Sequence, residues 1–146
     1  MISDTKVVAI GGGTGLSTML KGLKLHTHNI TAVVTVADDG GSSGILRSDL
    51  GMLAPGDVRN CVSALAEVDP VMGELLNFRF KDGSLKGHSL GNLFLAALNE
   101  TSSSFDEAVK KFSHLTGVVG TVYPVTNESV TLSALLEDGR LIEGES

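Results

Sequence analysis

The sequence predicts an α/β protein with a Rossmann-like, three-layer α/β/α fold around a mostly parallel sheet. A continuous apolar run at 6–10 suits a strand that is buried on both faces of a sheet, and a second β-rich run lies at 30–36. A helical pattern separates the two runs, and a strand, a helix and a strand over this length predict a right-handed parallel crossover. The chain has 146 residues, which is enough for one compact domain.

The next elements are predicted from the spacing of apolar residues. Such residues recur at helical spacing from Leu16 to Leu23, so we expect a helix at 17–25. The segment 37–55 has no clear period, which predicts a long loop or a broken helical excursion, and loops of this length are usually functional or disordered. Further apolar patterns predict helices at 56–67, 71–78 and 90–98.

The last third of the chain predicts one more helix and several short strands. Ser104 and Glu107 form a capping box, so the helix that follows runs to about Leu115. Strand patterns resume at 118–119 and 121–126. An Asp-Gly pair predicts a hairpin turn within 132–142, and the sequence stops soon after it. We therefore interpret the sequence as the N-terminal part of a longer protein.

Composition and charge narrow the function classes. The chain carries 11 basic and 17 acidic residues, for a net charge of −6, and it has no basic run, so nucleic-acid binding is not expected. No segment approaches the roughly 18 apolar residues of a membrane span, which predicts a cytoplasmic protein without membrane insertion. Cys61 is the single cysteine, and its helical setting favours inert packing over a reactive thiol.

A glycine-rich turn follows the first predicted strand. The run Gly-Gly-Gly-Thr-Gly at 11–15 lets the backbone adopt positive φ and lets an anion approach the amides, while the helix after it offers unpaired N–H groups. The run is not a Walker loop, and Leu16 stands where the dinucleotide fingerprint has its third glycine. We expect a phosphate-binding turn for a nucleotide ligand, and the alternative is an ordinary strand-to-helix turn.

Two carboxylates follow the second predicted strand. Asp38 and Asp39 begin the loop at 38–44, and ligands of open α/β sheets collect at the carboxyl ends of the strands. Such a carboxylate can accept hydrogen bonds from ribose hydroxyls, and paired carboxylates can hold Mg²⁺ beside a phosphate. The structural alternative is an Asx turn with solvated carboxylates. We expect the glycine turn and this loop to form one wall of a pocket.

Two predicted helix starts carry further polar residues. The first has the sequence Pro-Gly-Asp-Val-Arg-Asn at 55–60, in which Arg59 can bind a phosphate or form a structural ion pair with a loop aspartate. The second has Gly-His-Ser-Leu-Gly-Asn at 87–92, in which Ser89 can cap the helix. His88 can act as a donor, a base or a phosphate partner. No arrangement typical of a serine hydrolase can be derived from these residues.

Five motifs occur in order along nearly the whole chain. They are Gly-Gly-Gly-Thr-Gly-Leu (11–16), Val-Ala-Asp-Asp-Gly-Gly-Ser-Ser-Gly (36–44), Pro-Gly-Asp-Val-Arg-Asn-Cys (55–61), Gly-His-Ser-Leu-Gly-Asn-Leu (87–93) and Tyr-Pro-Val-Thr (123–126). Each motif is weak alone, but the ordered set closely resembles the bacterial gluconeogenesis factor family, YvcK-like, within the CofD-like superfamily. The sequence departs from the family pattern at Ile45, where Arg is usual, and at Ala54, where Pro is frequent.

The resemblance implies a Rossmann-like fold and a function. It implies a cytoplasmic regulator that binds a nucleotide sugar and is required for cell shape during growth on gluconeogenic carbon sources. The related CofD branch implies an alternative, a Mg²⁺-dependent enzyme that transfers 2-phospho-lactate from a guanosine diphosphate conjugate to a deazaflavin precursor. We prefer the regulator because the motif set is that of the gluconeogenesis branch. A nicotinamide-dependent oxidoreductase is disfavoured by the broken dinucleotide fingerprint.

The hypothesis specifies partners and residues. The expected ligand is a nucleotide sugar or a nucleotide diphosphate, and a homo-oligomer and a regulated protein partner are compatible with it. No catalytic residue is assigned. Any Mg²⁺ would be held by Asp38 and Asp39. The expected ligand-binding residues are Gly11, Gly12, Gly13, Thr14, Gly15, Asp38, Asp39, Gly41, Ser42, Ser43, Asp57, Arg59, Asn60, His88, Ser89 and Asn92.

Overall fold

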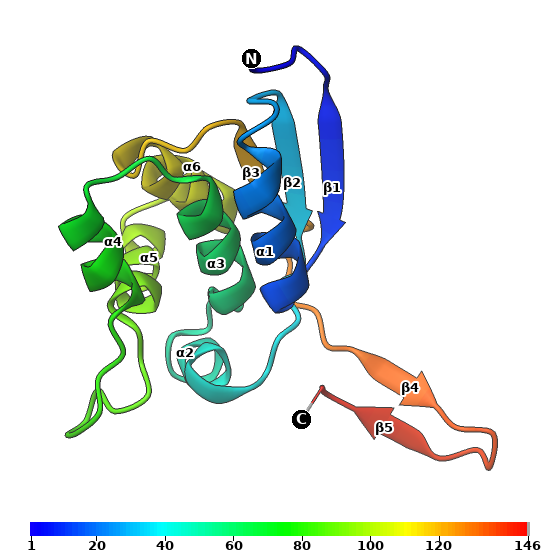
Figure 1. The fold of residues 1–146 in the computed structure, drawn as a ribbon. Coiled ribbons are helices and arrows are strands. Elements are labelled where there is room, and N and C mark those ends of the chain that lie inside the picture. The colour runs from blue at the N-terminus through cyan, green and yellow to red at the C-terminus, as the bar shows by residue number, and fades with distance from the viewer. Residues whose placement is uncertain (146) are drawn as a thin grey trace.

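The computed structural model describes residues 1–145 and contains a parallel three-stranded sheet of order β1-β2-β3 (Figure 1). The strands are β1 (Val7–Gly11), β2 (Ile30–Val34) and β3 (Thr121–Pro124). Val7 pairs with Ile30, and Thr31 pairs with Thr121. The predicted α/β class and the parallel crossover between the first two strands are therefore confirmed.

Within residues 1–145, one helix lies between β1 and β2 and five lie between β2 and β3, and two of these six differ clearly from the sequence prediction. The first begins at Gly13 rather than at Ser17, so most of the glycine-rich turn is helical. The segment 37–55 contains a regular helix that ends at Gly51, whose φ is 62°. That helix has no apolar period because it buries two serines and only one leucine. The helices are α1 (Gly13–Leu23), α2 (Gly41–Leu50), α3 (Gly56–Leu65), α4 (Pro70–Asn77), α5 (Leu90–Glu100) and α6 (Phe105–Leu115).

The helices of residues 1–145 cover one face of the sheet, with α1, α3 and α6 packed against its strands (Figure 1). Along β2, burial alternates strictly, with Ile30, Ala32 and Val34 buried beneath the helices. On β1, the side chains of Val8 and Ile10 point to the opposite face and remain 65% and 75% exposed. One helical layer of the expected three-layer arrangement therefore lies within the described residues.

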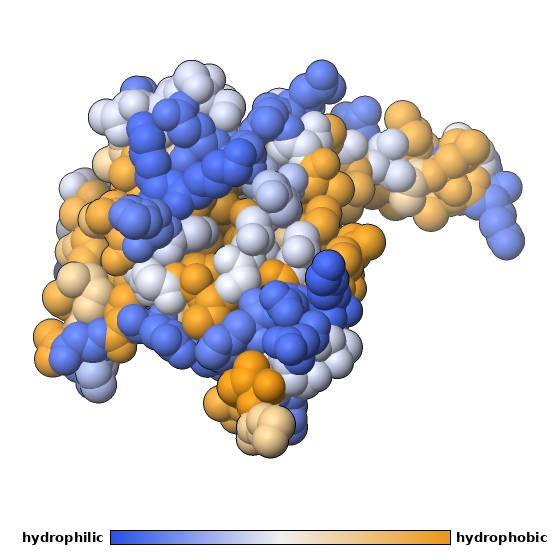
Figure 2. Space-filling view, turned by 90° about the horizontal axis from the view of Figure 1, so that it is seen from above, coloured by the Kyte–Doolittle hydropathy of each residue, from blue (hydrophilic) through white to orange (hydrophobic). Residues whose placement is uncertain are grey.

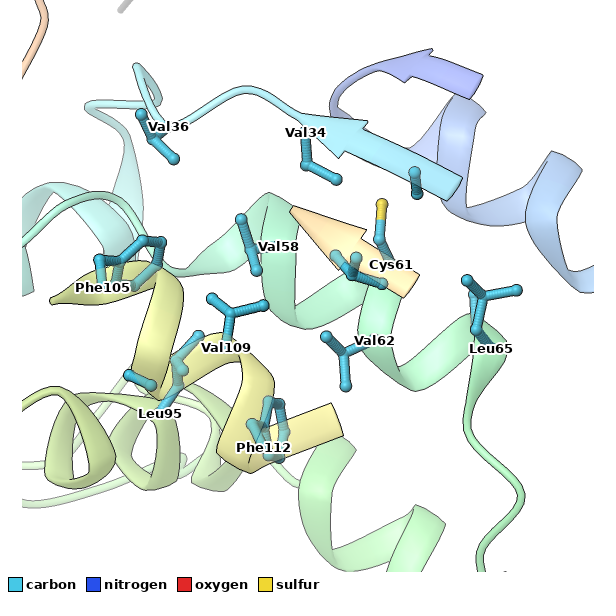
Figure 3. Packing of buried hydrophobic residues seen from close by; sticks show 14 of the residues in the cluster. Val34, Val36, Val58, Cys61, Val62, Leu65, Leu95, Phe105, Val109 and Phe112 are labelled. Atoms are coloured by element: carbon cyan, nitrogen blue, oxygen red, sulfur yellow. The ribbon is translucent and has the colours of Figure 1, made fainter. Parts of the chain in front are cut away.

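The core lies between α3, α5, α6 and the covered face of the sheet (Figure 3). Val58 and Val62 of α3 meet Val109 and Phe112 of α6, and all four are fully buried. Cys61 is buried in the same cluster, and desolvation, with a smaller effect of Asp57, raises the pKa of its thiol to about 12. A thiol in this environment stays protonated at neutral pH and behaves as a small apolar side chain, as predicted.

A β-hairpin extends away from the body and carries hydrophobic side chains (Figures 1 and 2). It pairs β4 (Ser133–Leu135) with β5 (Leu141–Glu143) in antiparallel register, and Gly139 in its turn has a φ of 85°. The hairpin predicted from the Asp-Gly pair is thus confirmed. Leu135 and Leu141 are exposed on it.

The predicted capping box at the start of α6 forms with one change. The Ser104 hydroxyl accepts a hydrogen bond from the Glu107 amide at 3.1 Å, but the Glu107 carboxylate binds Ser103 instead of the Ser104 amide. Hydrogen bonds from Ser103 therefore lower the pKa of Glu107 to about 2.

The longest helices among residues 1–145 have 11 residues, and none is long and apolar enough to cross a membrane.

Candidate functional site

The two loops chosen from the sequence lie at the same edge of the sheet. β1 and β2 are parallel neighbours, and Gly11 at the end of β1 pairs with Val34 near the end of β2. The glycine-rich turn leads from β1 into α1, and the loop with Asp38 and Asp39 leads from β2 toward α2. The carboxyl ends of these strands are where an open α/β sheet binds its ligand.

A cavity of about 200 Å³ opens beside this edge. It is bounded by the loop after β2, the N-terminal turns of α2 and α3, and side chains from α5 and the loop before it. The glycine-rich turn does not line it, and neither do three other predicted residues, Asp39, His88 and Ser89. The lining residues are Asp38, Gly40, Gly41, Ser42, Ser43, Gly56, Asp57, Arg59, Asn60, Arg79 and Asn92.

Arg59 is the most unusual of the lining residues, because its charge is buried and unpaired. Its side chain is 6% exposed, and it forms no ion pair with a carboxylate within residues 1–145. Its Nε donates to Asn92 Oδ1 at 3.3 Å, and its Nη1 donates to Asn77 Oδ1 at 2.9 Å. Burial and the nearby Arg79 both lower the pKa of Arg59, which shows that the site disfavours its charge. An anion in the cavity would remove this cost.

The glycine-rich turn is occupied by a side chain of the protein. The Asp57 carboxylate lies against the turn, close to the positions that a Cβ on Gly12 or Gly13 would take. A Cβ on Gly12 would lie 3.1 Å from Asp57 Oδ2 and 2.1 Å from the Thr35 methyl group, so only glycine fits there. Helix α1 has neither a side-chain N-cap nor an acidic residue in its first turn, and Asp57 supplies the missing negative charge.

Asp57 makes the stability of the protein depend on pH. Desolvation is the largest cause that raises its pKa above 3.8, and the charges of Asp38 and Glu145 add to it. A raised pKa means that the folded state holds the proton more tightly than the unfolded state. The resulting stabilisation is complete below pH 3.8 and is lost as the pH rises through the folded-state pKa.

We therefore expect Asp57→Asn to raise the free energy of unfolding at neutral pH, because asparagine carries no charge to desolvate or repel. The gain should shrink as the pH falls toward 3.8. Urea denaturation across this pH range measures both effects, and Asp82→Asn, in an exposed loop, is the matched control. A gain that does not change with pH would contradict this assignment.

The two aspartates after β2 have different environments. Asp38 lines the cavity, and its Oδ1 accepts a hydrogen bond from the Gly40 amide at 2.9 Å, so the Asx turn forms here. Asp39 does not line the cavity, and its Oδ2 accepts a hydrogen bond from the Glu145 amide at 3.0 Å. No group of three or more His, Cys, Asp or Glu side chains within residues 1–145 is arranged to hold a metal ion. A role of Asp38 and Asp39 in Mg²⁺ binding stays a prediction.

Arg47 forms hydrogen bonds with the backbone of the loop that carries Asp38 and Asp39. Its Nη1 donates to the carbonyl oxygens of Ala37 and Asp38 at 2.9 and 3.3 Å, and its Nη2 donates to the Val130 carbonyl at 2.7 Å. Arg47 lies two residues after Ile45, the position where the family usually has arginine. Its guanidinium binds backbone carbonyl oxygens and does not line the cavity.

His88 and Asn92, at the start of α5, form a buried hydrogen-bond network with Ser42 of α2. The Ser42 hydroxyl lies 2.8 Å from His88 Nδ1, and Asn92 Nδ2 donates to the same hydroxyl at 3.1 Å. Ser89 caps α5 by accepting a hydrogen bond from the Asn92 amide at 3.1 Å, which is the capping role considered for it from the sequence. Ser42 and His88 are 46 residues apart, so sequence motifs alone could not pair them.

Three lining residues were missed by the sequence analysis. The Gly56 amide donates to the Ser43 hydroxyl at 3.0 Å, and a Cβ on Gly56 would lie 2.5 Å from that oxygen. Gly40 is the N-terminal flanking residue of α2. Arg79 lies on the loop between α4 and α5, and it was detectable only as a lone cation between Phe78 and Phe80.

Comparisons with known proteins match nearly the whole chain. The family model of 2-phospho-L-lactate transferase CofD matches residues 7–146. The gluconeogenesis factor of Bacillus subtilis is 51% identical over 142 residues, which are 97% of this chain and 45% of the relative. A protein of Thermoanaerobacterium thermosulfurigenes, provisionally described as a gluconeogenesis factor, is 63% identical over 145 residues, which are 99% of this chain and 45% of that protein.

A solved structure agrees with the fold. The crystal structure of a Bacillus halodurans protein superimposes with a TM-score of 0.92 and 48% sequence identity, over 96% of this chain and 46% of that one. The chain thus spans less than half the length of these relatives. Because the family model matches nearly the whole chain and these relatives are 51% and 63% identical to it, the chain belongs to the CofD family, in its gluconeogenesis factor (YvcK-like) group.

Proposed function

We propose that this protein is a cytoplasmic regulator that binds a nucleotide sugar, with the diphosphate of the ligand in the cavity beside Arg59. The observation that carries the proposal is the buried guanidinium of Arg59, which no carboxylate of residues 1–145 neutralises. A guanidinium forms two parallel hydrogen bonds with a phosphate, and burial strengthens them.

The surroundings of Arg59 support a phosphate there. Arg79 adds a second positive charge, and the first turns of α2 and α3 add the positive ends of two helix dipoles. Asp38 and Asp57 also line the cavity, and their carboxylates suit sugar or ribose hydroxyls. At about 200 Å³ the cavity is smaller than the roughly 300–1,000 Å³ of a pocket for a whole ligand, so the rest of the ligand would extend beyond it.

The regulator is preferred over the transferase. The Bacillus subtilis relative bears the name gluconeogenesis factor, and that relative resembles this chain at 51% identity. The family model takes its name from a transferase, which keeps Mg²⁺-dependent transfer of a phospho-lactyl group from a nucleotide conjugate as the alternative. The two differ in turnover: a regulator leaves its nucleotide ligand unchanged, and a transferase consumes it.

The test is calorimetry with UDP-glucose and GDP-mannose as probes. Arg59→Met keeps an unbranched side chain and removes the charge, so we expect it to weaken binding by about 10- to 150-fold, equivalent to the roughly 1.5–3 kcal/mol of a hydrogen bond to a charged group. Arg140→Met, on the exposed hairpin, is the matched control and should bind normally. Unchanged affinity in a folded Arg59→Met protein would refute the proposal.

The same samples distinguish the two functions. Phosphorus NMR of the parent protein with each probe and with Mg²⁺ should show no loss of the diphosphate signals. Mg²⁺-dependent consumption of a nucleotide conjugate, absent in Arg59→Met, would establish the transferase instead.

A further inference from the structure

The hydrogen bonds that lead from Arg59 through Asn92 to Ser42 have a fixed direction. Arg59 is only a donor, so the Asn92 atom that faces its Nε at 3.3 Å must be the amide oxygen. The amide nitrogen of Asn92 therefore faces Ser42 and donates to its hydroxyl at 3.1 Å. The orientation of Asn92 is thus fixed by the charge of Arg59.

This direction leaves the hydroxyl hydrogen of Ser42 one acceptor in the network. The Ser42 oxygen accepts from Asn92, and the other atom within hydrogen-bond distance of it is His88 Nδ1 at 2.8 Å. If the Ser42 hydroxyl donates to Nδ1, a singly protonated His88 carries its hydrogen on Nε2. All four residues are at least nine-tenths buried.

Ser42 differs from His88 in one respect: it also lines the cavity, at the first turn of α2. An anion beside Arg59 would thus lie within the same cavity as the Ser42 hydroxyl. A hydrogen bond to a charged phosphate oxygen is roughly twice as strong as one between neutral groups. Such an oxygen would compete with His88 Nδ1 for the single hydroxyl hydrogen.

We propose that Ser42 is a phosphate-binding residue whose hydroxyl is held by His88 until the anion enters, and that His88 then changes tautomer. On binding, the Ser42 hydrogen turns from His88 Nδ1 to a phosphate oxygen. Nδ1 takes up a proton by way of the cavity that Ser42 lines and then donates to the Ser42 oxygen, while Nε2 releases its proton, so the number of protons on the ring does not change.

The assignment has a consequence for ligand selection, and it rests on the proposed function. His88 touches no ligand and acts as a positioning residue for Ser42. Only a strong, charged acceptor can take the hydrogen from an imidazole nitrogen, so the pair favours phosphate oxygens over sugar hydroxyls at this position. Without His88 Nδ1 as a competing acceptor, the Ser42 hydroxyl would have no reason to prefer phosphate oxygens over sugar hydroxyls.

The test is long-range proton–nitrogen NMR of protein labelled with ¹⁵N-histidine, with inorganic pyrophosphate as the probe. The protein has four histidines, and His88→Gln identifies the signals of His88 by their loss. Without the probe, we expect Nδ1 of His88 to resonate as an unprotonated nitrogen and Nε2 as a protonated one. With saturating pyrophosphate the two should exchange, while His114, on the last turn of α6, stays unchanged.

Affinity measurements provide the second readout. Ser42→Ala should weaken pyrophosphate binding by about tenfold, and Ser42→Thr, which keeps the hydroxyl, should restore most of it. Pyrophosphate bound with an unchanged His88 tautomer, or with net proton uptake in calorimetry, would overturn this inference and leave the proposed function standing. A hydrogen on Nδ1 in the free protein would overturn it as well. Absence of pyrophosphate and nucleotide-sugar binding by the parent would overturn both.

Discussion

Replacing Phe112 with alanine is expected to lower the free energy of unfolding by about 3–5 kcal/mol. Phe112 is fully buried on α6, and its ring lies 5.6 Å from that of Phe94 on α5, so it joins two helices of the core (Figure 3). The substitution removes the apolar area of the ring and leaves a cavity that the neighbouring backbone cannot close. Urea denaturation measures the loss as a lower midpoint at unchanged slope.

The control for this variant lies one turn further along the same helix. Leu115 is 60% exposed, so Leu115→Ala should change the free energy of unfolding by no more than about 0.5 kcal/mol. Equal losses in the two variants would show that α6 does not pack as described.

Replacing Gly91 with alanine should damage folding and ligand binding together. Gly91 is on the first turn of α5, and an added Cβ would lie 2.6 Å from the Leu76 carbonyl oxygen and 2.8 Å from Arg59 Cδ. Because the carbonyl belongs to the backbone of α4, Arg59 is the part that can move. We expect a loss of about 1–3 kcal/mol in the free energy of unfolding from overpacking. The displaced guanidinium should also lower the affinity for UDP-glucose by at least tenfold.

Gly22→Ala is the matched control for this steric argument. Gly22 lies within α1, and its added Cβ would meet nothing within 4 Å. Alanine there should stabilise the helix by up to about 1 kcal/mol and leave binding unchanged. Calorimetry and urea denaturation of both variants separate the two effects, and normal affinity in Gly91→Ala would show that Arg59 is not held against this glycine.

The sequence predicted those parts of the fold that depend on local periodicity. The parallel crossover and helices α3 to α6 are confirmed because their apolar spacing matches their burial. The hairpin is confirmed because it depends on the local chemistry of the Asp-Gly turn, and its strands are exposed. Helix α2 was not predicted as a regular helix, because it buries Ser42 and Ser43 and therefore has no apolar stripe. The early start of α1 was missed because glycines are poor helix formers, whereas Gly13 begins the helix with a φ of 70°.

The site was predictable as a group of loops but not as a set of contacts. Periodicity places the residues after β1 and β2 at one sheet edge, and it cannot show that Asp57 occupies the glycine-rich turn. The pairing of Ser42 with His88 and the burial of Arg59 without a counter-ion depend on how three helices pack. Such tertiary contacts leave no trace in the spacing of residues along the chain.

The strand order also determines when the cavity can form during folding. β3 pairs with β2 only after five helices of intervening chain, and closing so long a loop costs entropy before any contact repays it. The hydrogen bonds of Ser42 to His88 and Asn92 likewise join segments 46 and 50 residues apart. The local helices can therefore appear first, and the cavity beside Arg59 arises with the completed sheet. A ligand that binds only the completed cavity would stabilise the folded state, so the folded fraction should rise with the ligand concentration.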